Sequence, residues 1–163
     1  MRTRRVLSGA FRIFVLCCLG CSALLAQNIS SKPAGDYSGM YTFLQEGEFV
    51  QITIEDQGRV TGFVSRYGDQ ESDRGTFLNQ FFKEGKLDGD KLSFTTQIVH
   101  GVSFAFNGAF ERGEGKSLAD EAYYLLKGTL IESNTAEKKT SSKSREVVFK
   151  SFPKEVGSSS KPD

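Results

Sequence analysis

From Gly35 onward, apolar residues alternate with polar residues or form short runs that end at Gly, Asp or Asn. No stretch of helical length shows the 3.6-residue period of an amphipathic helix. Alternation at period two places apolar side chains on one face of a strand, and short runs between turn residues are typical of all-β chains. The chain therefore predicts an all-β domain.

The pattern predicts eight strands, most of them joined by short connections such as Asp88-Gly89-Asp90 and His100-Gly101. Short glycine-containing turns join antiparallel neighbours. Eight strands in that order can close into a barrel that holds one small ligand. We predict an eight-stranded antiparallel up-and-down β-barrel. Its strands are expected at Tyr37–Leu44, Phe49–Glu55, Arg59–Tyr67, Phe77–Leu87, Lys91–Val99, Val102–Glu111, Ala122–Ile131 and Arg145–Phe152.

Two connections are longer than the rest. Gly68–Gly75 is charged and bracketed by glycine, and Ser133–Ser144 is polar throughout. Polar segments without apolar periodicity are typical of loops, so we predict a solvated loop at the first and a mobile loop at the second. The barrel is predicted over residues 35–153, between a flexible linker at 27–34 and a disordered tail at 154–163.

Residues 1–26 have the layout of a secretory signal peptide, in which a basic start precedes the apolar run Ile13–Leu25 and the small residue Ala26. The run is shorter than the roughly 20 residues of a membrane-spanning helix. We predict cleavage after Ala26 and export to the periplasm or the medium. The alternative is a lipoprotein signal at Cys21, because Leu19-Gly20-Cys21 resembles part of a bacterial lipobox. Only that alternative attaches the protein to a membrane.

Cleavage after Ala26 removes all three cysteines and four of the 21 basic residues, but none of the 20 acidic ones. The remaining 17 basic and 20 acidic residues give a net charge of −3. A negative balance disfavours nucleic acid as a partner. The loss of cysteine excludes thiol nucleophiles and Cys-ligated metal sites.

Few residues suggest catalysis or metal binding. The single histidine, His100, is interpreted as an exposed residue of a hairpin turn. No serine lies in a Gly-x-Ser-x-Gly context. Asp69, Glu71 and Asp73 alternate like calcium ligands, but Gln80 stands where a bidentate Glu is needed. We predict that the protein is not an enzyme and uses no metal or cofactor.

The segment Lys91–Gly108 predicts how the interior is filled. Its two strands pair through a turn at His100-Gly101, so the phenylalanines point into the barrel. Glycines within strands are expected where the wall bends, at Gly62, Gly108 and Gly128. The inward set is predicted to be Leu92, Phe94, Thr96 and Ile98 on one strand and Val102, Phe104, Phe106 and Gly108 on the other.

The order of these elements resembles the avidin and streptavidin family, within the calycin group of eight-stranded barrels. The likeness spans nearly all of residues 35–152 and rests on loose patterns. Gly35-Asp36-Tyr37 opens the first strand as in many calycins, and DQGRVTG from Asp56 resembles the second hairpin and third strand of the family. Phe106–Phe110 resembles its sixth strand, and Tyr124–Leu126 its seventh.

The chain departs from the family where biotin is held. It has no tryptophan, and Phe94, Phe106 and Tyr124 stand at the matching points. The tyrosine expected after Thr61-Gly62 and the acidic residue expected near Val148 are missing. The resemblance therefore implies an aromatic-lined cavity with Phe94, Phe106 and Tyr124 as ligand-binding residues, and it argues against biotin.

Four predicted strands carry large apolar residues on both faces, at Phe81-Phe82, Tyr123-Tyr124, Leu125-Leu126 and Val147-Val148. This pattern favours either cover by another subunit or partner on the outer wall, or scattered surface residues. The predicted function is the binding of a small apolar or amphipathic molecule by an exported barrel. The alternative is a non-catalytic cell-envelope scaffold or protein-interaction module with a filled barrel. An interior void of about 300 Å³ or more favours binding.

Overall fold

The structure, a computed structural model, describes residues 37–69, 71–136 and 139–154, all within one compact unit, Ser31–Asp163. The predicted signal peptide and linker, and all of the predicted tail except Lys154, lie outside the described residues. In this part of the chain no helix is long and apolar enough to cross a membrane.

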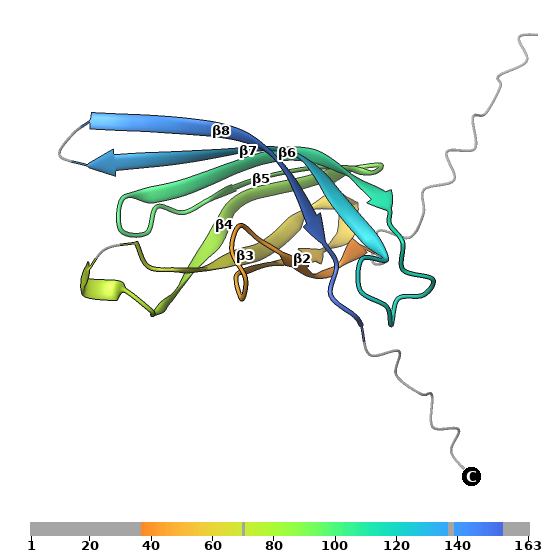
Figure 1. Ribbon diagram of the computed structural model, residues 1–163. Coiled ribbons are helices and arrows are strands. Elements are labelled where there is room, and N and C mark those ends of the chain that lie inside the picture. The colour runs from red at the N-terminus through yellow and green to blue at the C-terminus, as the bar shows by residue number, and fades with distance from the viewer. Residues whose placement is uncertain (1–36, 70, 137–138, 155–163) are drawn as a thin grey trace, which may run out of the picture. The chain divides into compact units, whose positions relative to one another are not determined.

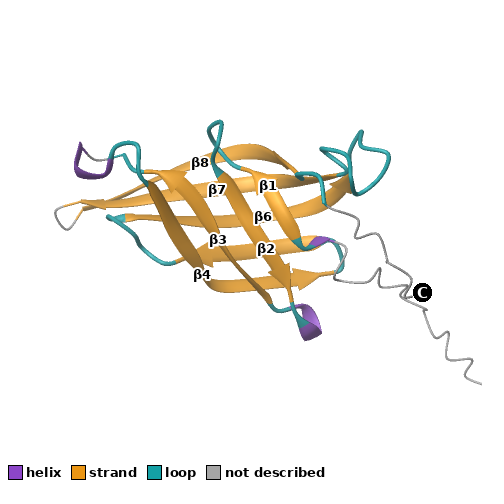
Figure 2. Ribbon diagram, turned by 90° about the horizontal axis from the view of Figure 1, so that it is seen from below, coloured by secondary structure: helices purple, strands orange, loops and turns teal. Residues whose placement is uncertain are grey.

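Eight strands form one antiparallel sheet in which each strand pairs with the next along the chain (Figures 1 and 2). The predicted up-and-down order is confirmed. The 3-10 turns η2 (Asp56–Gly58) and η3 (Glu71–Asp73) lie in the connections. The strands are β1 (Gly39–Thr42), β2 (Phe49–Ile54), β3 (Val60–Tyr67), β4 (Phe77–Asp88), β5 (Lys91–Thr96), β6 (Val102–Arg112), β7 (Tyr124–Ala136) and β8 (Lys139–Lys150).

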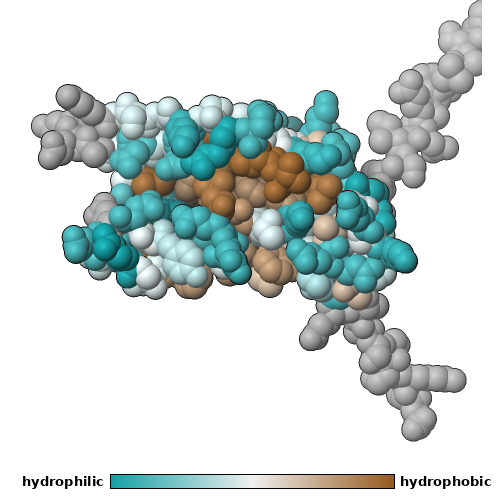
Figure 3. Space-filling model, in the orientation of Figure 1, coloured by the Kyte–Doolittle hydropathy of each residue, from teal (hydrophilic) through white to brown (hydrophobic). Residues whose placement is uncertain are grey.

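The sheet curls until its first and last strands meet at one end only. Tyr41 forms an antiparallel bridge with Ser151, and the backbone N–H of Lys150 donates to Oγ1 of Thr42 at 2.9 Å. Because β1 has four residues and β8 has 12, the first part of β8 continues past β1 and leaves a seam in a half-barrel. Figure 3 shows a band of apolar residues across the side of the molecule drawn in Figure 1.

Inward-facing side chains fill the barrel, as β6 shows. Val102, Phe104, Phe106 and Phe110 are buried at alternate or nearly alternate positions. The ring of Phe106 stacks on that of Phe94 with centroids 5.3 Å apart. Burying one such side chain contributes about 1.5–3 kcal/mol. The prediction that the phenylalanines of this hairpin point inward is confirmed.

Gly108 and Gly128 are opposite one another on β6 and β7, beneath the ring of Phe106. A Cβ atom on Gly108 would lie 2.5 Å from Cζ of Phe106 and 2.8 Å from Cα of Gly128. Any larger residue at either position would collide with the facing strand or with the ring. The two glycines therefore make room for a core aromatic residue.

The prediction of a mobile loop at Ser133–Ser144 is wrong, because β7 and β8 continue through most of it. Hydroxyl groups meet across the two strands, Ser133 with Ser142 at 3.0 Å and Thr135 with Thr140 at 3.3 Å. This part of the hairpin is held by the backbone ladder and by polar pairs. It therefore lacks the apolar alternation on which the strand prediction depended.

The predicted end of the fifth strand is also wrong. β5 ends at Thr96, and Ile98 is 66% exposed rather than inward-facing. The chain then turns at His100 and Gly101, whose φ angles of 50° and 78° lie in the left-handed region. A two-residue hairpin turn of type I′ has positive φ at both central positions, so the predicted turn is confirmed.

Aromatic side chains also form a row on the outer face of β2, β3 and β4. The ring centroids of Phe49 and Phe63 are 5.9 Å apart, and those of Phe63 and Phe81 are 5.6 Å apart. Phe81 is 54% exposed, whereas its neighbour Phe82 packs against the core. The adjacent residues Phe81 and Phe82 of β4 thus lie on opposite faces of the sheet.

Candidate ligand-binding site

The two ends of the barrel carry different side chains. At the closed end, the ring of Tyr37 stacks on Phe110 at 4.3 Å and meets the edge of Tyr124 at 5.0 Å. At the other end, which we call the mouth, several inward-facing positions carry polar or charged side chains. A cavity of about 250 Å³ lies there, and the residues that line it include Phe43, Glu48, Arg66, Phe104, Glu132 and Arg145.

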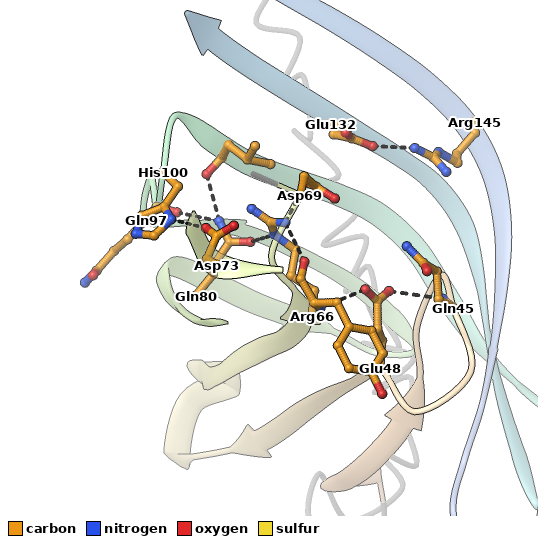
Figure 4. A network of polar contacts seen from close by, with 12 residues as sticks. Gln45, Glu48, Arg66, Asp69, Asp73, Gln80, Gln97, His100, Glu132 and Arg145 are labelled. Carbon is orange, nitrogen blue, oxygen red and sulfur yellow. Dashed lines mark hydrogen bonds and ion pairs between the residues drawn. The ribbon is translucent and has the colours of Figure 1, made fainter. Parts of the chain in front are cut away.

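Arg66 is buried at the base of the mouth, on the inward face of β3 (Figure 4). Its Nε donates to Oε1 of Gln80 at 2.8 Å. Its Nη1 donates to the backbone carbonyl of Tyr67 at 2.9 Å and to Oδ2 of Asp69 at 2.7 Å. A buried charge without such partners is strongly destabilising. These bonds therefore hold the guanidinium group of Arg66 in one place.

The side chain of Gln80 connects the guanidinium group of Arg66 to the start of β6. Its side chain is fully buried, and Nε2 donates to the backbone carbonyls of Val102 at 2.7 Å and Gln97 at 3.4 Å. Because Oε1 accepts from Arg66, the amide is bonded on both of its sides. Gln80 thus links β3 to the start of β6.

Glu48 closes the connection between β1 and β2. Its carboxylate accepts from the backbone N–H of Tyr67 at 3.0 Å and of Gln45 at 3.1 Å. Burial raises the pKa of Glu48, although these bonds and Arg66 act to lower it. Asp120, which is exposed, also accepts two backbone N–H groups, and there the bonds lower the pKa. Burial, rather than the number of bonds, decides the behaviour of Glu48.

Arg145 and Glu132 form an ion pair higher in the mouth, on β8 and β7 (Figure 4). Nη2 of Arg145 contacts Oε2 of Glu132, and both side chains are about one-third exposed. Nε of Arg145 is buried and has no hydrogen-bond partner. Among the described residues it is the one buried side-chain nitrogen or oxygen in that condition.

His100 contacts the carboxylate of Asp73 through Nδ1, which ties η3 to the turn between β5 and β6. The side chain of His100 is 46% exposed, so the interpretation as an exposed turn residue is confirmed. Asp73 itself is buried, which corrects the prediction of a wholly solvated loop. Within the described ranges, no group of three or more His, Cys, Asp or Glu residues could hold a metal ion.

The structure brings two of the three predicted site residues together. Phe94 and Phe106 stack in the core, with exposed fractions of 2% and 3%. Tyr124 is buried at the closed end, six residues along β7 from Leu130, which is opposite Phe106. At about 3.4 Å per residue, that separation is about 20 Å. Contact of these three residues with a ligand stays a prediction.

Ring contacts connect the predicted residues to the mouth. Phe106 meets Phe149 at 5.8 Å, and Phe149 meets Phe43, which lines the cavity, at 5.2 Å. Phe94 and Phe106 also border a larger groove of about 490 Å³. Its other residues include Ser93 and Asn107, which alternate with these buried positions, so that groove lies on the outer wall.

Strand parity could have identified the polar residues of the mouth. Arg66 shares a strand face with Val64, and Arg145 shares one with Phe149. A charged residue on the face that carries core residues points into the barrel or its opening. The predicted inward set contains only residues from the apolar alternation of two strands, so Arg66, Glu132 and Arg145 were not predicted.

These observations define an eight-stranded up-and-down β-barrel with a packed end and a polar mouth. No protein-family model matches the chain, and none of the curated proteins matches it by sequence. Among solved structures, the chain is similar to the rhizavidin-biotin complex, with a TM-score of 0.56 and 12% identity over 76% of this chain and 98% of that chain. It is also similar to apo short afifavidin, with a TM-score of 0.52 and 14% identity over 75% of this chain and 99% of that chain.

The chain therefore has an avidin-like fold, as the sequence resemblance predicted. At identities of 12% and 14% the likeness shows the fold alone. What the barrel binds has to be argued from its own residues.

Proposed function

We propose that this protein binds a small amphipathic molecule at the mouth of the barrel. The carrying observation is the cavity of about 250 Å³ in which the rings of Phe43 and Phe104 lie beside Glu48, Arg66 and Arg145. This cavity is smaller than the void of about 300 Å³ that is expected to favour binding, so the proposal depends on its lining. Apolar walls with a few polar groups in fixed positions are typical of small-molecule sites. The avidin-like fold supports the same function.

The cavity limits the size of the ligand. At about 30 Å³ for each water molecule in the liquid, 250 Å³ corresponds to about eight waters, and so to a ligand of about ten non-hydrogen atoms. Its apolar part would lie on Phe43 and Phe104, whose rings meet edge to face at 5.2 Å. Phe94 and Phe106 would then support the cavity floor through Phe149.

Biotin is not the ligand in this proposal. Rhizavidin has been solved with biotin, but this chain has no tryptophan. Its mouth instead carries two arginine–carboxylate pairs, Arg66 with Asp69 and Arg145 with Glu132.

We also propose that the protein is not an enzyme. It would act in the periplasm or the medium after removal of residues 1–26, with a lipid anchor at Cys21 as the alternative.

Filling the mouth tests the proposal. An uncharged fluorescent dye about the size of naphthalene is titrated into the purified chain, and its fluorescence reports uptake. Leu44→Trp places a large ring at the mouth, and the control Ile131→Trp places one in the outer groove, which Ile131 lines. Loss of dye binding in L44W alone supports the mouth as the site. Loss in I131W alone, or binding unaffected by both changes, contradicts it.

The exposed aromatic row favours a second function, that of a scaffold or interaction module that pairs through its outer wall. Phe77 and Phe81 are exposed on β4, next to Tyr67 and Phe63 on β3. Clustered exposed aromatic residues mark interaction surfaces. In this case sedimentation of the chain should show a homo-oligomer that the double change Phe77→Ser and Phe81→Ser dissociates. A monomer at all concentrations contradicts self-association.

A further inference from the structure

The strand β8 pairs with β7 along its whole length, but only its last part also meets β1 (Figure 1). The backbone N–H of Ser151 donates to the carbonyl of Tyr124 in β7, whereas that of Lys150 donates to Oγ1 of Thr42 in β1. Because consecutive residues of a strand direct their backbone groups to opposite edges, the even-numbered residues of β8 direct N–H and C=O away from β7.

Along Thr140–Glu146, which we call the open edge, these outward backbone groups have no hydrogen-bond partner among the residues that the structure describes. β1 ends at Thr42, and the N–H of Phe43 then bonds to the carbonyl of Glu48, so no strand continues beside the open edge. Every residue of the open edge except Arg145 is exposed. A row of exposed, unpaired N–H and C=O groups is a template for a further strand.

Basic side chains lie on the inward face of the open edge. Lys143 and Arg145 share this face with the buried Phe149, because all three are at alternate positions of β8. One carboxylate of β7 lies beside them, since Glu132 is opposite Lys143 and forms its ion pair with Arg145. Lys143 forms no ion pair within the described ranges. An incoming strand with an acidic residue on this face would supply a second negative charge.

A second copy of the chain fits the open edge less well. If two copies of β8 pair about a two-fold axis at Lys143, the two Lys143 side chains are opposite one another. If the axis lies at Ser144, Lys143 is opposite Arg145. Like charges directly opposite one another destabilise a pair of strands. The charges therefore favour an acidic strand over self-pairing.

We propose that the open edge binds an extended acidic segment of another protein as an added antiparallel strand, with a carboxylate of that segment facing Lys143. In this mode of recognition, main-chain hydrogen bonds give affinity and alternate side chains give specificity. The proposal does not depend on a ligand in the mouth, because it uses the backbone of β8 and a lysine outside that cavity.

The probe is the capped peptide Thr-Glu-Thr-Glu-Thr-Val-Thr, whose glutamates can face Lys143 and Arg145 while its threonine amides bond to the open edge. In a titration of the purified chain followed by nitrogen-15 NMR, the largest shifts should occur at the even-numbered amides of the open edge. N-methylation of the two central threonine amides should weaken binding at least about tenfold. N-methylation of the two glutamate amides, which point away from β8, should change it by less than about twofold.

Ser144→Pro and Ser144→Ala form a matched pair of variants. Proline removes an N–H that points away from β7, so the ladder to β7 is kept, as for proline on edge strands in general. S144P should weaken binding of the peptide at least about tenfold, and S144A by less than about twofold. Circular dichroism verifies that both variants are folded. If S144P does not fold, the N-methylated peptides carry the same test.

A charge exchange tests the acidic preference. Replacing the peptide glutamate opposite Lys143 by lysine should weaken binding about fivefold, and Lys143→Glu should restore it. Lys127→Glu makes the same charge change on the outer face of β7, where Lys127 pairs with Glu111 at 2.7 Å, and should not restore it.

Absence of binding at about 1 mM peptide, or binding that survives S144P or methylation of the threonine amides, overturns the proposal. Equal binding of the glutamate and lysine peptides also overturns it, because the partner would then not be selected by its acidic residues. A dimer that S144P dissociates would place a second copy on the open edge, and it overturns the proposal as well.

Discussion

The β5–β6 hairpin and the outer half of the β7–β8 hairpin have the same backbone pairing but opposite side chains. Along β6, Phe104 and Phe106 bury their rings in the core. Beyond Leu130, β7 instead carries Glu132 on the inward face and Ser133 on the outward face, where its hydroxyl meets Ser142. One hairpin covers the core, and the other continues past it.

The difference indicates that the residues that stabilise the fold and the residues proposed to bind a ligand lie in different parts of the sheet. Apolar burial is the main favourable term in folding, and it is concentrated in strands such as β6. Polar cross-strand pairs contribute only tenths of a kcal/mol each. The part of β7–β8 that extends past the core is therefore expected to have little effect on stability, and its inward positions can carry polar groups such as Arg145, which lines the cavity of the mouth.

The largest effect is expected from the apolar hairpin. Phe106→Ala should lower the free energy of unfolding by about 3–5 kcal/mol, because it removes a buried ring and leaves a cavity. Urea denaturation measures the loss, with Phe110→Ala, on the same strand near the closed end, as a comparator. A loss near zero at Phe106 would mean that its ring does not fill the core.

The second largest effect is expected at the pair of glycines, Gly108 and Gly128, that makes room for the ring of Phe106. Gly128→Ala should cost about 1–3 kcal/mol, as for overpacking in general, because a Cβ there would lie 2.4 Å from Cα of Gly108. Ser93→Ala, on the exposed face of β5, should change stability by less than about 0.5 kcal/mol. Thermal denaturation compares the two. Equal effects would contradict the close approach of β6 and β7.

The base of the mouth should show a similar or smaller effect. Arg66→Met leaves Oε1 of Gln80 buried without its donor, which costs about 1–3 kcal/mol. Adding Gln80→Met removes that acceptor too, so the double variant should lose less than the sum of the two single losses. A double-mutant cycle by urea denaturation measures the coupling. Strict additivity would show that the two side chains do not interact.

The buried carboxylate of the mouth should titrate differently from an exposed one. The pKa of Glu48 should lie above 4.5 and that of Asp120 below 3.8. A raised carboxyl pKa means that the contribution of Glu48 to stability is present below about pH 4.5 and is lost as the pH rises through its folded pKa. Carbon NMR titration of both carboxyl groups tests the directions. A Glu48 midpoint below 4.5 would contradict burial.

The smallest effect is expected in the polar half of β7–β8. Ser142→Ala should change stability by less than about 0.5 kcal/mol. Hydrogen exchange should nevertheless be faster at the amides of residues 132–136 than at those of β6, because little apolar burial protects them. Equal protection in the two hairpins would remove the contrast between them.

The sequence by itself determined the all-β class, the up-and-down order and the inward phenylalanines of β5 and β6. Each follows from local physics, since alternation assigns a face to each side chain and a turn such as His100-Gly101 joins neighbouring strands. The avidin-like fold was predicted from resemblance and is confirmed by the structural likeness.

Only the tertiary structure decided which partners the inward polar residues meet and where the barrel stays open. Strand parity places Arg66 on the inward face, but its bond to Gln80, and the bond from Gln80 to the start of β6, form only when the sheet curls. The polar strands within Ser133–Ser144 form because each pairs with the other, a contact that neither encodes as apolar alternation. The seam depends on β1 ending after four residues beside a strand of 12. Pairing between residues far apart in the chain determines these features, and local sequence patterns carry no information about that pairing.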